Sequence, residues 1–437
     1  RMWRTLTRKM KDSGVEWIGE IPEDWEVKKI KYMFRIVNGN GFPERLQGEK
    51  EGDYPFYKNS DINRSGIYIN KSNNYISEKT AIINGFTVIP SNSILIGKIG
   101  EALKRNHRKI NLSECMIDNN MMALVPKENE LFSYYLLSII DMFWFDNNGT
   151  IPSINSNKLR NFKVPYVNKT LQRKIAEILN DKTQKIDKLI LSTRQSIEEL
   201  KKYKQSLITE AVTKGLDPNV EMKDSGIEWI GKIPIHWDVS RPNRVSKIVR
   251  GNTVFQKNDM KHEGDFVAVQ YGQVYQITEM DKNYNFYVDK YLYKEEQQVE
   301  NGDTILVSTS ETLEDLGHSC FYNRDDFGLL GGEQMILRPN KTVLYDKFLY
   351  YASTYFKYEL NQYATGLKVF RFKLADLKKI NIIIPSSIKE QQQIVSYLDE
   401  KTSRIDKLIE DKTKVIEELE SYKKSLIYEY VTGKRET

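Results

Sequence analysis

QRKIAEILNDKTQKIDKLILSTRQSIEELKKYKQSLITEAVT, from Gln172 to Thr213, returns later in the chain as QQQIVSYLDEKTSRIDKLIEDKTKVIEELESYKKSLIYEYVT, from Gln391 to Thr432. About half of the aligned positions are identical, which indicates an internally repeated architecture. Neither copy contains Gly or Pro, and apolar residues recur every three or four positions, so each copy is predicted to form one long helix. At about 1.5 Å per residue, each helix would be roughly 60 Å long.

Each predicted helix has one apolar stripe that must be covered, and the simplest cover is the other copy lying antiparallel. The spacing is that of a coiled-coil seam. The predicted seam contains Ile175, Leu179, Ile186, Leu189, Ile197, Leu200, Leu207 and Ala211 in the first copy, and Ile394, Leu398, Ile405, Leu408, Ile416, Leu419 and Leu426 in the second. The alternative, two unrelated surface helices, requires neither this length nor this repetition.

A second repeat precedes each half of the chain. Residues 11–27 read KDSGVEWIGEIPEDWEV, and residues 223–239 read KDSGIEWIGKIPIHWDV. We call each of these segments a clasp, because its Trp and Pro residues are predicted to pack an irregular stretch onto the edge of a domain. Exposed Trp side chains that bind a partner are the alternative.

A globular segment lies between each clasp and its helix, at about 28–168 and 240–388. Each segment is predicted to contain short strands, then an aromatic helical run (Leu131–Phe145 or Phe348–Tyr363), a Gly-containing loop and a strand that ends in Pro. The predicted strands include Gly66–Ile69, Thr87–Ile89, Ile94–Ile96, Phe266–Val269, Thr304–Val307 and Gln334–Leu337.

The predicted fold class is α+β: two α/β domains separated by two long helices that form an antiparallel coiled coil, in a circular organisation with pseudo-two-fold symmetry. The predicted domains are residues 11–170 and 223–388, each with its clasp, and the predicted helical spacers are residues 171–215 and 389–434. The end of the second helix and the start of the chain together resemble the link between the two halves, so the termini are expected to lie close together.

Composition restricts the class of protein. The chain has 437 residues, 40% of them hydrophobic, and a net charge of +6, which permits a polyanionic partner without proving one. The apolar run Leu131–Phe145 is too short to span a bilayer, and no secretory signal pattern precedes the first clasp. Cys115 and Cys320 lie far apart in the sequence. A cytoplasmic protein without membrane contact is expected.

Motifs for catalysis are missing. The chain has no Walker A loop, no methyltransferase run of the Asn-Pro-Pro-Tyr type and no Gly-x-Ser-x-Gly turn. None of its four His residues has a neighbouring Cys or His at ligand spacing. We therefore predict neither catalytic residues nor a metal site.

Candidate nucleic-acid-binding residues of the first half lie in two segments. The run KRNHRK, residues 104–109, is predicted to be a basic loop after the strand at Ile94–Ile96, with groups suited to phosphates and base edges. The run KNSDINR, residues 58–64, mixes amide, acidic and guanidinium groups. The candidates are Lys58, Asn59, Asp61, Asn63, Arg64, Lys98, Lys104, Arg105, Asn106, His107, Arg108 and Lys109. A solvated run of charges is the alternative.

In the second half, polar groups replace most of the positive charge at the corresponding places. The segments are QYGQVYQ at 270–276, VSTSETL at 307–313 and TGLKVFRFK at 365–373. Their candidates are Gln270, Tyr271, Gln273, Ser308, Thr309, Ser310, Lys368, Arg371 and Lys373. Two divergent domains with polar segments at equivalent places indicate two different recognition surfaces, although each segment alone could be an ordinary loop.

The clasps, the strands ending in Pro that lead into QRKIAEILN and EQQQIVSYLDEKTSRIDKLI, and the terminal YKKSLIYEYVTGK resemble the specificity subunits of type I restriction-modification enzymes. The resemblance covers nearly the whole chain. It implies two target-recognition domains, each reading one half of a split, asymmetric site in double-stranded DNA, with the helices setting the spacing.

The resemblance also implies a subunit without catalysis or a cofactor of its own. Its partners would be two methyltransferase subunits, which use S-adenosylmethionine to methylate adenine, and restriction subunits driven by ATP and Mg²⁺. The partner-binding role of the helices is assigned by resemblance to Asp187, Lys188, Asp406 and Lys407. For Leu189 and Leu408, a role in joining the two helices is favoured.

Two other function classes compete with this interpretation. One is a coiled-coil scaffold that binds only proteins, which salt-dependent, sequence-selective DNA binding would exclude. The other is a self-contained DNA-modifying enzyme, against which the missing methyltransferase motif argues.

Overall fold

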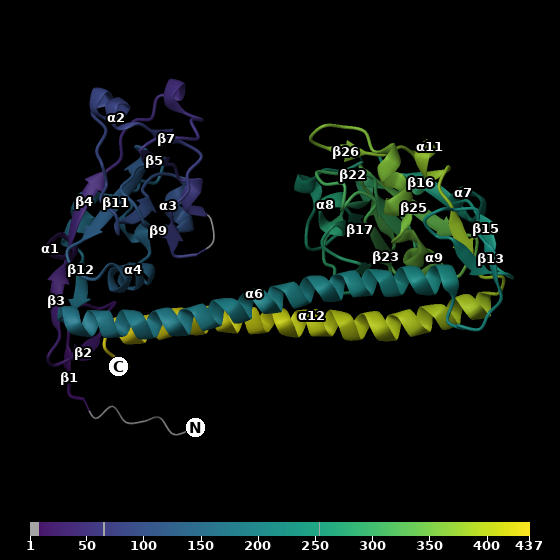
Figure 1. Ribbon diagram of the computed structural model, residues 1–437. Helices are drawn as coiled ribbons and strands as arrows, with labels where there is room; N and C mark the ends of the chain where they lie inside the picture. The colour runs from purple at the N-terminus through teal and green to yellow at the C-terminus, as the bar shows by residue number, and fades with distance from the viewer. Residues whose placement is uncertain (1–7, 64–65, 253) are drawn as a thin grey trace. The chain divides into compact units, whose positions relative to one another are not determined.

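The computed structural model describes residues 8–63, 66–252 and 254–437 (Figure 1). The chain divides into two units: Arg1–Thr193 with Lys414–Thr437, and Arg194–Thr413. The division falls inside both long helices, α6 (Lys169–Lys214) and α12 (Ile388–Val431). Each unit therefore combines one α/β domain with a part of both helices. The predicted division into two domains and two separate helical spacers stays a prediction.

The clasp of the first unit is a short hairpin of β1 (Met10–Asp12) and β2 (Glu20–Pro22). It continues into β3 (Glu26–Lys29), which pairs with β12 (Lys163–Tyr166), the predicted strand ending in Pro. Trp25 is buried, and Gly433, just past the end of α12, lies against it. A Cβ on Gly433 would lie 2.5 Å from Cδ of Pro22, and φ there is +73°. Only glycine therefore fits this approach of the helix end to the clasp.

The clasp of the second unit repeats this arrangement with β13 (Met222–Asp224), β14 (Lys232–Pro234), β15 (Asp238–Ser240) and β27 (Ile382–Ile384). Trp237 is buried, and its indole Nε1 donates to Glu390 Oε1 at 2.9 Å. Gly215, past the end of α6, has φ +77° and faces the ring of Trp237. The buried Trp25 and Trp237 confirm a packing role for the second Trp of each clasp, whereas Trp229 is exposed.

The domain of the first unit contains two sheets. The larger has the strand order β4-β11-β8-β9-β6, and the smaller has the order β10-β5-β7. Their strands are β4 (Phe34–Asn38), β5 (Tyr54–Tyr57), β6 (Tyr68–Ile69), β7 (Tyr75–Ile76), β8 (Ile94–Gly97), β9 (Arg108–Asn111), β10 (Met116–Ile117) and β11 (Met121–Pro126).

The domain of the second unit has the orders β16-β25-β21-β23-β18 and β19-β17-β24-β20, and a two-stranded ladder β22-β26. The strands are β16 (Ser246–Arg250), β17 (Phe266–Val269), β18 (Glu279–Met280), β19 (Tyr287–Val288), β20 (Gln298–Val299), β21 (Thr304–Val307), β22 (Thr309–Ser310), β23 (Ser319–Tyr322), β24 (Gly328–Leu330), β25 (Gln334–Pro339) and β26 (Phe370–Arg371).

The five-stranded sheets of the two domains share one topology although their sequences differ. In each five-stranded sheet the last strand pairs parallel with its neighbour, β6 with β9 and β18 with β23, and the other pairs are antiparallel. The smaller sheets both contain a parallel pair, β5 with β10 and β17 with β24. Predicted strands are confirmed except at Thr87–Ile89, where Ile89 makes only an isolated bridge to Cys115.

Short helices connect these strands. In the first unit they are α1 (Ile30–Met33), α2 (Glu78–Asn84), α3 (Glu101–Arg105), α4 (Glu130–Ser138) and α5 (Ser156–Asn161). In the second they are α7 (Pro242–Val245), α8 (Tyr271–Val274), α9 (Asp346–Ser353), α10 (Phe356–Leu360) and α11 (Leu374–Leu377). The predicted aromatic helical runs are therefore broken: one becomes α4 and a 3-10 turn at Met142–Phe145, and the other becomes α9, α10 and a 3-10 turn at Asn361–Tyr363.

The long helices run antiparallel within each unit. In the first unit, Lys174 donates to the carbonyl of Thr437, and Asp187 pairs with Lys423. Asp187 follows Lys174 in the chain, whereas its partner Lys423 precedes Thr437, so the two segments run in opposite directions. In the second unit, Lys204 pairs with Asp406. The helix ends also pack on the domains, since Tyr135 of α4 bonds Thr183 at 2.9 Å and Tyr351 of α9 bonds Asp399 at 2.6 Å.

The apolar seam differs from the predicted one at two equivalent positions. Ile186 and Ile190 are buried, whereas Leu189 is 55% exposed; in the second helix Ile405 is buried and Leu408 is 49% exposed. The placement of Leu189 and Leu408 on the seam is therefore wrong. Positions 183, 186, 190, 193 and 197 are buried or half-buried, in alternating steps of three and four. A stripe of that period includes Ile190. It excludes Leu189, which lies about 100° away from Ile190 around the helix axis.

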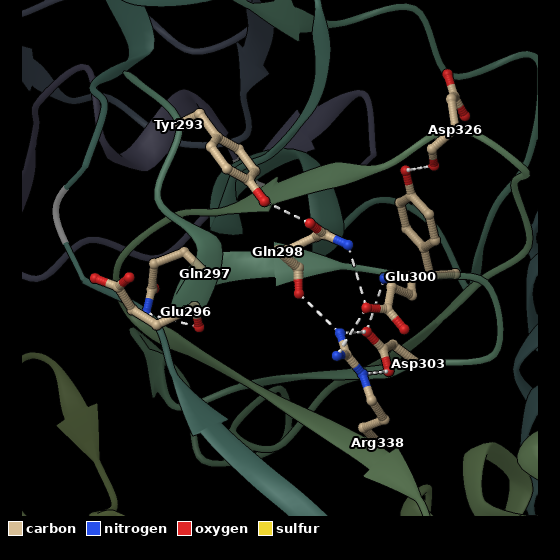
Figure 2. A network of polar contacts seen from close by, with 9 residues as sticks. Tyr293, Glu296, Gln297, Gln298, Glu300, Asp303, Asp326 and Arg338 are labelled. Carbon is tan, nitrogen blue, oxygen red and sulfur yellow. Dashed lines mark hydrogen bonds and ion pairs between the residues drawn. The ribbon is translucent and has the colours of Figure 1, made fainter. Parts of the chain in front are cut away.

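A buried acid in the second unit is compensated by one arginine. Arg338 of β25 donates to both carboxylate oxygens of Asp303, at 2.9 and 2.7 Å, and to Glu300 Oε1 at 3.0 Å. It also donates to the carbonyl of Gln298 at 2.8 Å, as Figure 2 shows. Burial raises the pKa of Asp303, and the hydrogen bond from Arg338 opposes that rise. Arg338 thus links β25 to the turn between β20 and β21.

Replacing Arg338 with Met (R338M) should reduce the free energy of unfolding by about 1–3 kcal/mol near pH 7, because Asp303 loses its charged partner. Without Arg338 the pKa of Asp303 rises further, and an acid whose pKa is raised in the folded state destabilises the fold fully above that pKa and progressively less as the pH falls toward the pKa of the unfolded chain. The loss relative to the parent chain should therefore shrink at about pH 5. Thermal unfolding of both proteins at the two pH values measures this.

The matched control is Lys261→Met, which breaks an exposed ion pair to Asp289 of 2.6 Å and should cost less than about 1 kcal/mol. A loss in R338M that is equally large at both pH values would contradict the role given to Asp303.

Candidate nucleic-acid interface

The basic segment 104–109 of the first unit is a helix, a turn and a strand, so the prediction of a loop there is wrong. Helix α3 ends in Lys104 and Arg105, whose exposed side chains lie 4.0 and 3.9 Å from the carboxylate of Glu101. Asn106 ends the helix with φ +55°, and its side chain accepts from the backbone N–H of Met142 at 3.1 Å. Lys104 and Arg105 remain available to a ligand, and Asn106 serves mainly the fold.

Arg108 and Lys109 point into the domain from β9. The Arg108 guanidinium donates to Asn106 Oδ1 at 2.6 Å and to the carbonyl of Ile140 at 3.4 Å. Burial lowers the pKa of Arg108 to about 10 and also lowers that of Lys109, which donates to the carbonyl of Gly66. Both side chains are buried, so the structure does not support the prediction that they face DNA. Strand β9 is paired on both sides, with β8 and with β6, so its side chains lie within the fold.

The turn at residues 58–63 lies next to α3 and β9. Asp61 is buried and accepts from the backbone N–H of Lys58 at 2.8 Å, so it shapes the turn. Asn63 is exposed, and its Oδ1 lies 2.8 Å from His107 Nδ1. Lys58 and Asn59 are half-buried, and Arg64 lies outside the described residues. The pair Asn63 and His107 joins the two predicted segments of the first unit into one surface.

Charge on this surface comes from Lys104 and Arg105 and, in part, from Lys98. Lys98 donates to Asn38 Oδ1 at 3.0 Å, and burial lowers its pKa. Burial and the neighbouring Lys109, Arg105 and Arg108 lower the pKa of His107. The imidazole is therefore neutral near pH 7 and acts as a hydrogen-bonding group rather than as a cation for phosphate.

In the second unit, the predicted polar segments meet around β22. Tyr275 OH donates to the carbonyl of Thr309, which brings α8 against β22, and β22 pairs with β26. Ser308, Thr309 and Ser310 are buried, so the structure does not support the prediction that their hydroxyl groups face DNA. Gln270 accepts from the N–H of Gln273 at 3.2 Å and so caps α8. What remains accessible beside β22 is the exposed Tyr271 and the half-buried Gln273.

Positive charge in the second unit lies on the segment around β26. Lys368, Arg371 and Lys373 are all exposed. The Arg371 guanidinium lies 3.5 Å from the carboxylate of Glu333, which also accepts from the Thr309 hydroxyl. The backbone N–H of Lys373 donates to Asp376 at 2.9 Å and starts α11. Three positively charged side chains thus lie within one short stretch of chain.

Sequence reasoning missed Glu333 and two exposed apolar residues. Glu333 has φ +64° and connects β22 to Arg371; the preceding Gly331 and Gly332 were the available signal of an unusual turn. The apolar residues are Ile151 and Leu367, which lie on loops and are 66% and 99% exposed. Aliphatic residues in a loop give no sequence signal of exposure.

The predicted partner-binding acids connect the two long helices. Lys423 Nζ lies 2.6 Å from Asp187, and Lys204 Nζ lies 2.6 Å from Asp406, each pair within one unit. The two Asp residues occupy equivalent positions of the repeat, and so do the two Lys residues, so the same ion pair forms twice. Lys188 and Lys407 are exposed, as are the neighbouring Leu189 and Leu408. Partner binding through these residues stays a prediction.

Over residues 8–63, 66–252 and 254–437, no three His, Cys, Asp or Glu side chains are grouped so that they could hold a metal ion. In the same described ranges, no helix combines the length and the apolar character needed to cross a membrane.

A family model described as "Type I restriction modification DNA specificity domain" matches residues 22–202 and 234–419. The chain is similar to two proteins of Methanocaldococcus jannaschii, the putative type I restriction enzyme MjaX specificity subunit and the type I restriction enzyme MjaVIII specificity subunit. Identity is 28% over 434 and 436 residues, covering 95% of this chain in both cases and 95% and 93% of those proteins.

A chain solved in work on complex assembly and conformational transition of the type I R-M system has a similar fold. The TM-score is 0.66 at 13% identity, covering 94% of this chain and 98% of the other. At that identity the likeness concerns the fold, a mixed α/β chain with long helices.

We predict different effects for Arg105→Ala and Arg108→Ala. Loss of the exposed Arg105 should weaken binding to duplex DNA by about 1–3 kcal/mol if the guanidinium contacts a base, with thermal unfolding unchanged. Loss of the buried Arg108 should lower the unfolding temperature, because Asn106 and Ile140 lose their donor. Filter binding and thermal unfolding of both variants measure this. Normal DNA affinity in R105A would remove Arg105 from the interface.

Proposed function

Because the chain belongs to the family of type I restriction modification DNA specificity domains, we propose that it reads a bipartite, asymmetric DNA site, one half with each α/β domain. The observation that carries this proposal is the duplicated sheet topology with unlike side chains at equivalent places. After the central strand β8 the first domain presents Lys104 and Arg105; after β21 the hydroxyl groups of the second domain are buried, and the exposed side chains nearby are Tyr271 and Arg371. Unlike surfaces on one scaffold suit unlike half-sites.

We further propose that α6 and α12 pair along their lengths as an antiparallel coiled coil that sets the gap between the half-sites. The antiparallel contacts within each unit and the seam of alternating three and four residues support this pairing. Two contacts on one face of DNA are separated by about one helical turn, roughly 34 Å. A helical spacer is stiff enough to favour one gap length.

The equivalence of the two helix ends supports a circular, pseudo-two-fold organisation. Gly433 approaches the first clasp at Pro22 and Trp25, and Gly215 approaches the second at Pro234 and Trp237. The end of the chain thus takes, against the first clasp, the place that the link between the two halves takes against the second.

In this proposal the chain is a specificity subunit and not an enzyme. Its partners are double-stranded DNA, methyltransferase subunits and restriction subunits. Because the helical segment occurs twice, two methyltransferase subunits are proposed. S-adenosylmethionine, ATP and Mg²⁺ belong to those partners. A cytoplasmic location remains our expectation. The alternative of a coiled-coil scaffold that binds only proteins is not favoured, because the matched family is one of DNA specificity domains.

Selection of binding sites from random duplex DNA tests the proposed function. The chain, assembled with its cognate methyltransferase subunit, should enrich a split motif with two different halves and a fixed gap. Affinity for the enriched site should fall steeply with salt, as phosphate contacts require. A contiguous motif, or no enrichment, would mean that the chain does not read DNA with two domains.

We predict that the double variant Lys188→Glu, Lys407→Glu binds the methyltransferase subunit at least about tenfold more weakly, because it reverses charge at both proposed docking positions. Titration calorimetry gives affinity and stoichiometry, with two subunits expected per parent chain. Lys201→Glu, an exposed change on α6 outside the repeat IDKLI, is the matched control. Equal affinity in the parent and the double variant would place the partner contact elsewhere.

A further inference from the structure

A narrow loop projects from the second unit between the 3-10 turn Asn361–Tyr363 and α11. Its base is closed by Thr365 and Arg371, whose backbone groups bond each other in both directions at 3.0 and 2.9 Å. Arg371 also belongs to β26, which pairs with β22, so the loop is anchored beside the candidate interface. Gly366 has φ +125°, a conformation that permits the reversal of the chain.

The residue at the tip of this loop is Leu367, and it is 99% exposed, more than any other large apolar side chain of the described residues. Nothing in its own unit covers it. Removing a leucine side chain from water is worth about 1.5–3 kcal/mol. A fully exposed leucine on an anchored loop therefore offers binding energy to a ligand.

The first unit has a loop of the same construction at the equivalent place. It follows the 3-10 turn Met142–Phe145 and is closed by the bridge between Asp146 and Ile154, while Ser153 bridges Ile99 just after β8. In the second unit, Arg371 likewise pairs with Thr309 just after β21. The exposed apolar residue of the loop in the first unit is Ile151, which is 66% exposed. The two loops differ in sequence and length, but each has one aliphatic side chain that is mostly exposed.

The surroundings of Leu367 indicate what it meets. Lys368, Arg371 and Lys373 are exposed within six residues of it. Cations next to an apolar tip match a duplex, in which phosphates line the rims of a groove and the apolar faces of the bases become accessible when a base step is opened. Proteins that kink DNA insert Leu, Ile, Phe or Met between base pairs in this way.

We propose that Leu367 is a wedge that enters a groove of the bound DNA and partly unstacks one base step, while Lys368 and the neighbouring cations hold the flanking phosphates. Ile151 enters a groove in the same way in the other half-site. This inference rests on the proposed function and adds to it a specificity determinant: pyrimidine–purine steps unstack most easily, so the wedge selects such a step without hydrogen bonds to its bases.

A protein partner fits the loop less well. A stable protein interface buries about 800 Å² on each side. Leu367 and the partly exposed Val369 lie next to Lys368 and close to Arg371 and Lys373, whereas the centre of a protein interface is depleted of charge. DNA requires no broad apolar surface.

Fluorescence of 2-aminopurine tests the wedge, because this base becomes brighter when it is unstacked. The full chain, assembled with the methyltransferase subunit, is bound to duplexes that carry the probe at successive positions of both half-sites. One step in each half should brighten. Leu367→Ala should abolish the signal in one half only and weaken binding about tenfold. Ile151→Ala should abolish the signal in the other half.

Three further variants sharpen the test. Leu367→Met, which keeps an apolar wedge, should retain the signal. Val343→Ala, which shortens an exposed aliphatic residue on a different loop of the same unit, should leave both signal and affinity unchanged. Lys368→Ala should keep the signal and reduce the slope of log affinity against log salt by about 0.9, the loss of one phosphate contact.

The outcomes separate this inference from the proposed function. Selective binding of the split site without brightening at any step overturns the wedge and leaves the proposed function intact. Loss of methyltransferase assembly in Leu367→Ala, measured by size-exclusion chromatography, overturns the wedge in favour of a protein contact. Failure of the parent chain to bind any site selectively overturns both.

Discussion

An apolar stripe on each long helix, which must be covered along its length, is the constraint on which the structure depends. The stripe runs through Ile186, Ile190 and Ile197 in α6 and through Ile405 and Ile416 in α12, all of them buried. Because the helices carry the same repeat, one ion pair forms twice, Asp187 with Lys423 and Lys204 with Asp406. Exposed pairs of this kind contribute at most about 1 kcal/mol, so burial of the stripe carries the stability and the ion pairs fix the register.

The clasps and the domains follow from that duplication. Each helix is followed by a glycine that lies against the Trp of a clasp, and the five-stranded sheet of each domain repeats one order of strands. The same contacts therefore hold the scaffold of both halves, and the segments after β8 and β21 can differ between them. In the first unit they present Lys104 and Arg105 in a helix; in the second, hydroxyl groups of β22 are buried under Tyr275 and Glu333. A duplicated frame with unlike surfaces is what a reader of an asymmetric site requires.

The sequence predicted the frame well and the surface poorly, for a physical reason. Periodicity reports burial along a helix or strand, so α6, α12, β17 and β21 were predicted close to their observed bounds. A run of charges does not report direction. Arg108 and Lys109 belong to the same run as Arg105, yet a turn at Asn106 and the pairing of β9 bury them. Leu189 was misplaced because Ile190, one residue further on, fits the heptad equally well, and only packing decides between them. Leu367 carried no signal, since exposure of a loop residue depends on the fold.

The most direct test of two equivalent readers on one frame is a chain with two identical domains. Residues 238–387 are replaced by a copy of residues 26–168, the corresponding stretch between clasp and helix. The product is assembled with the methyltransferase subunit, and its binding sites are selected from random duplexes. The account predicts a split site whose halves are inverted copies of one sequence, separated by a fixed gap. An asymmetric split site, or a single contiguous one, would contradict it.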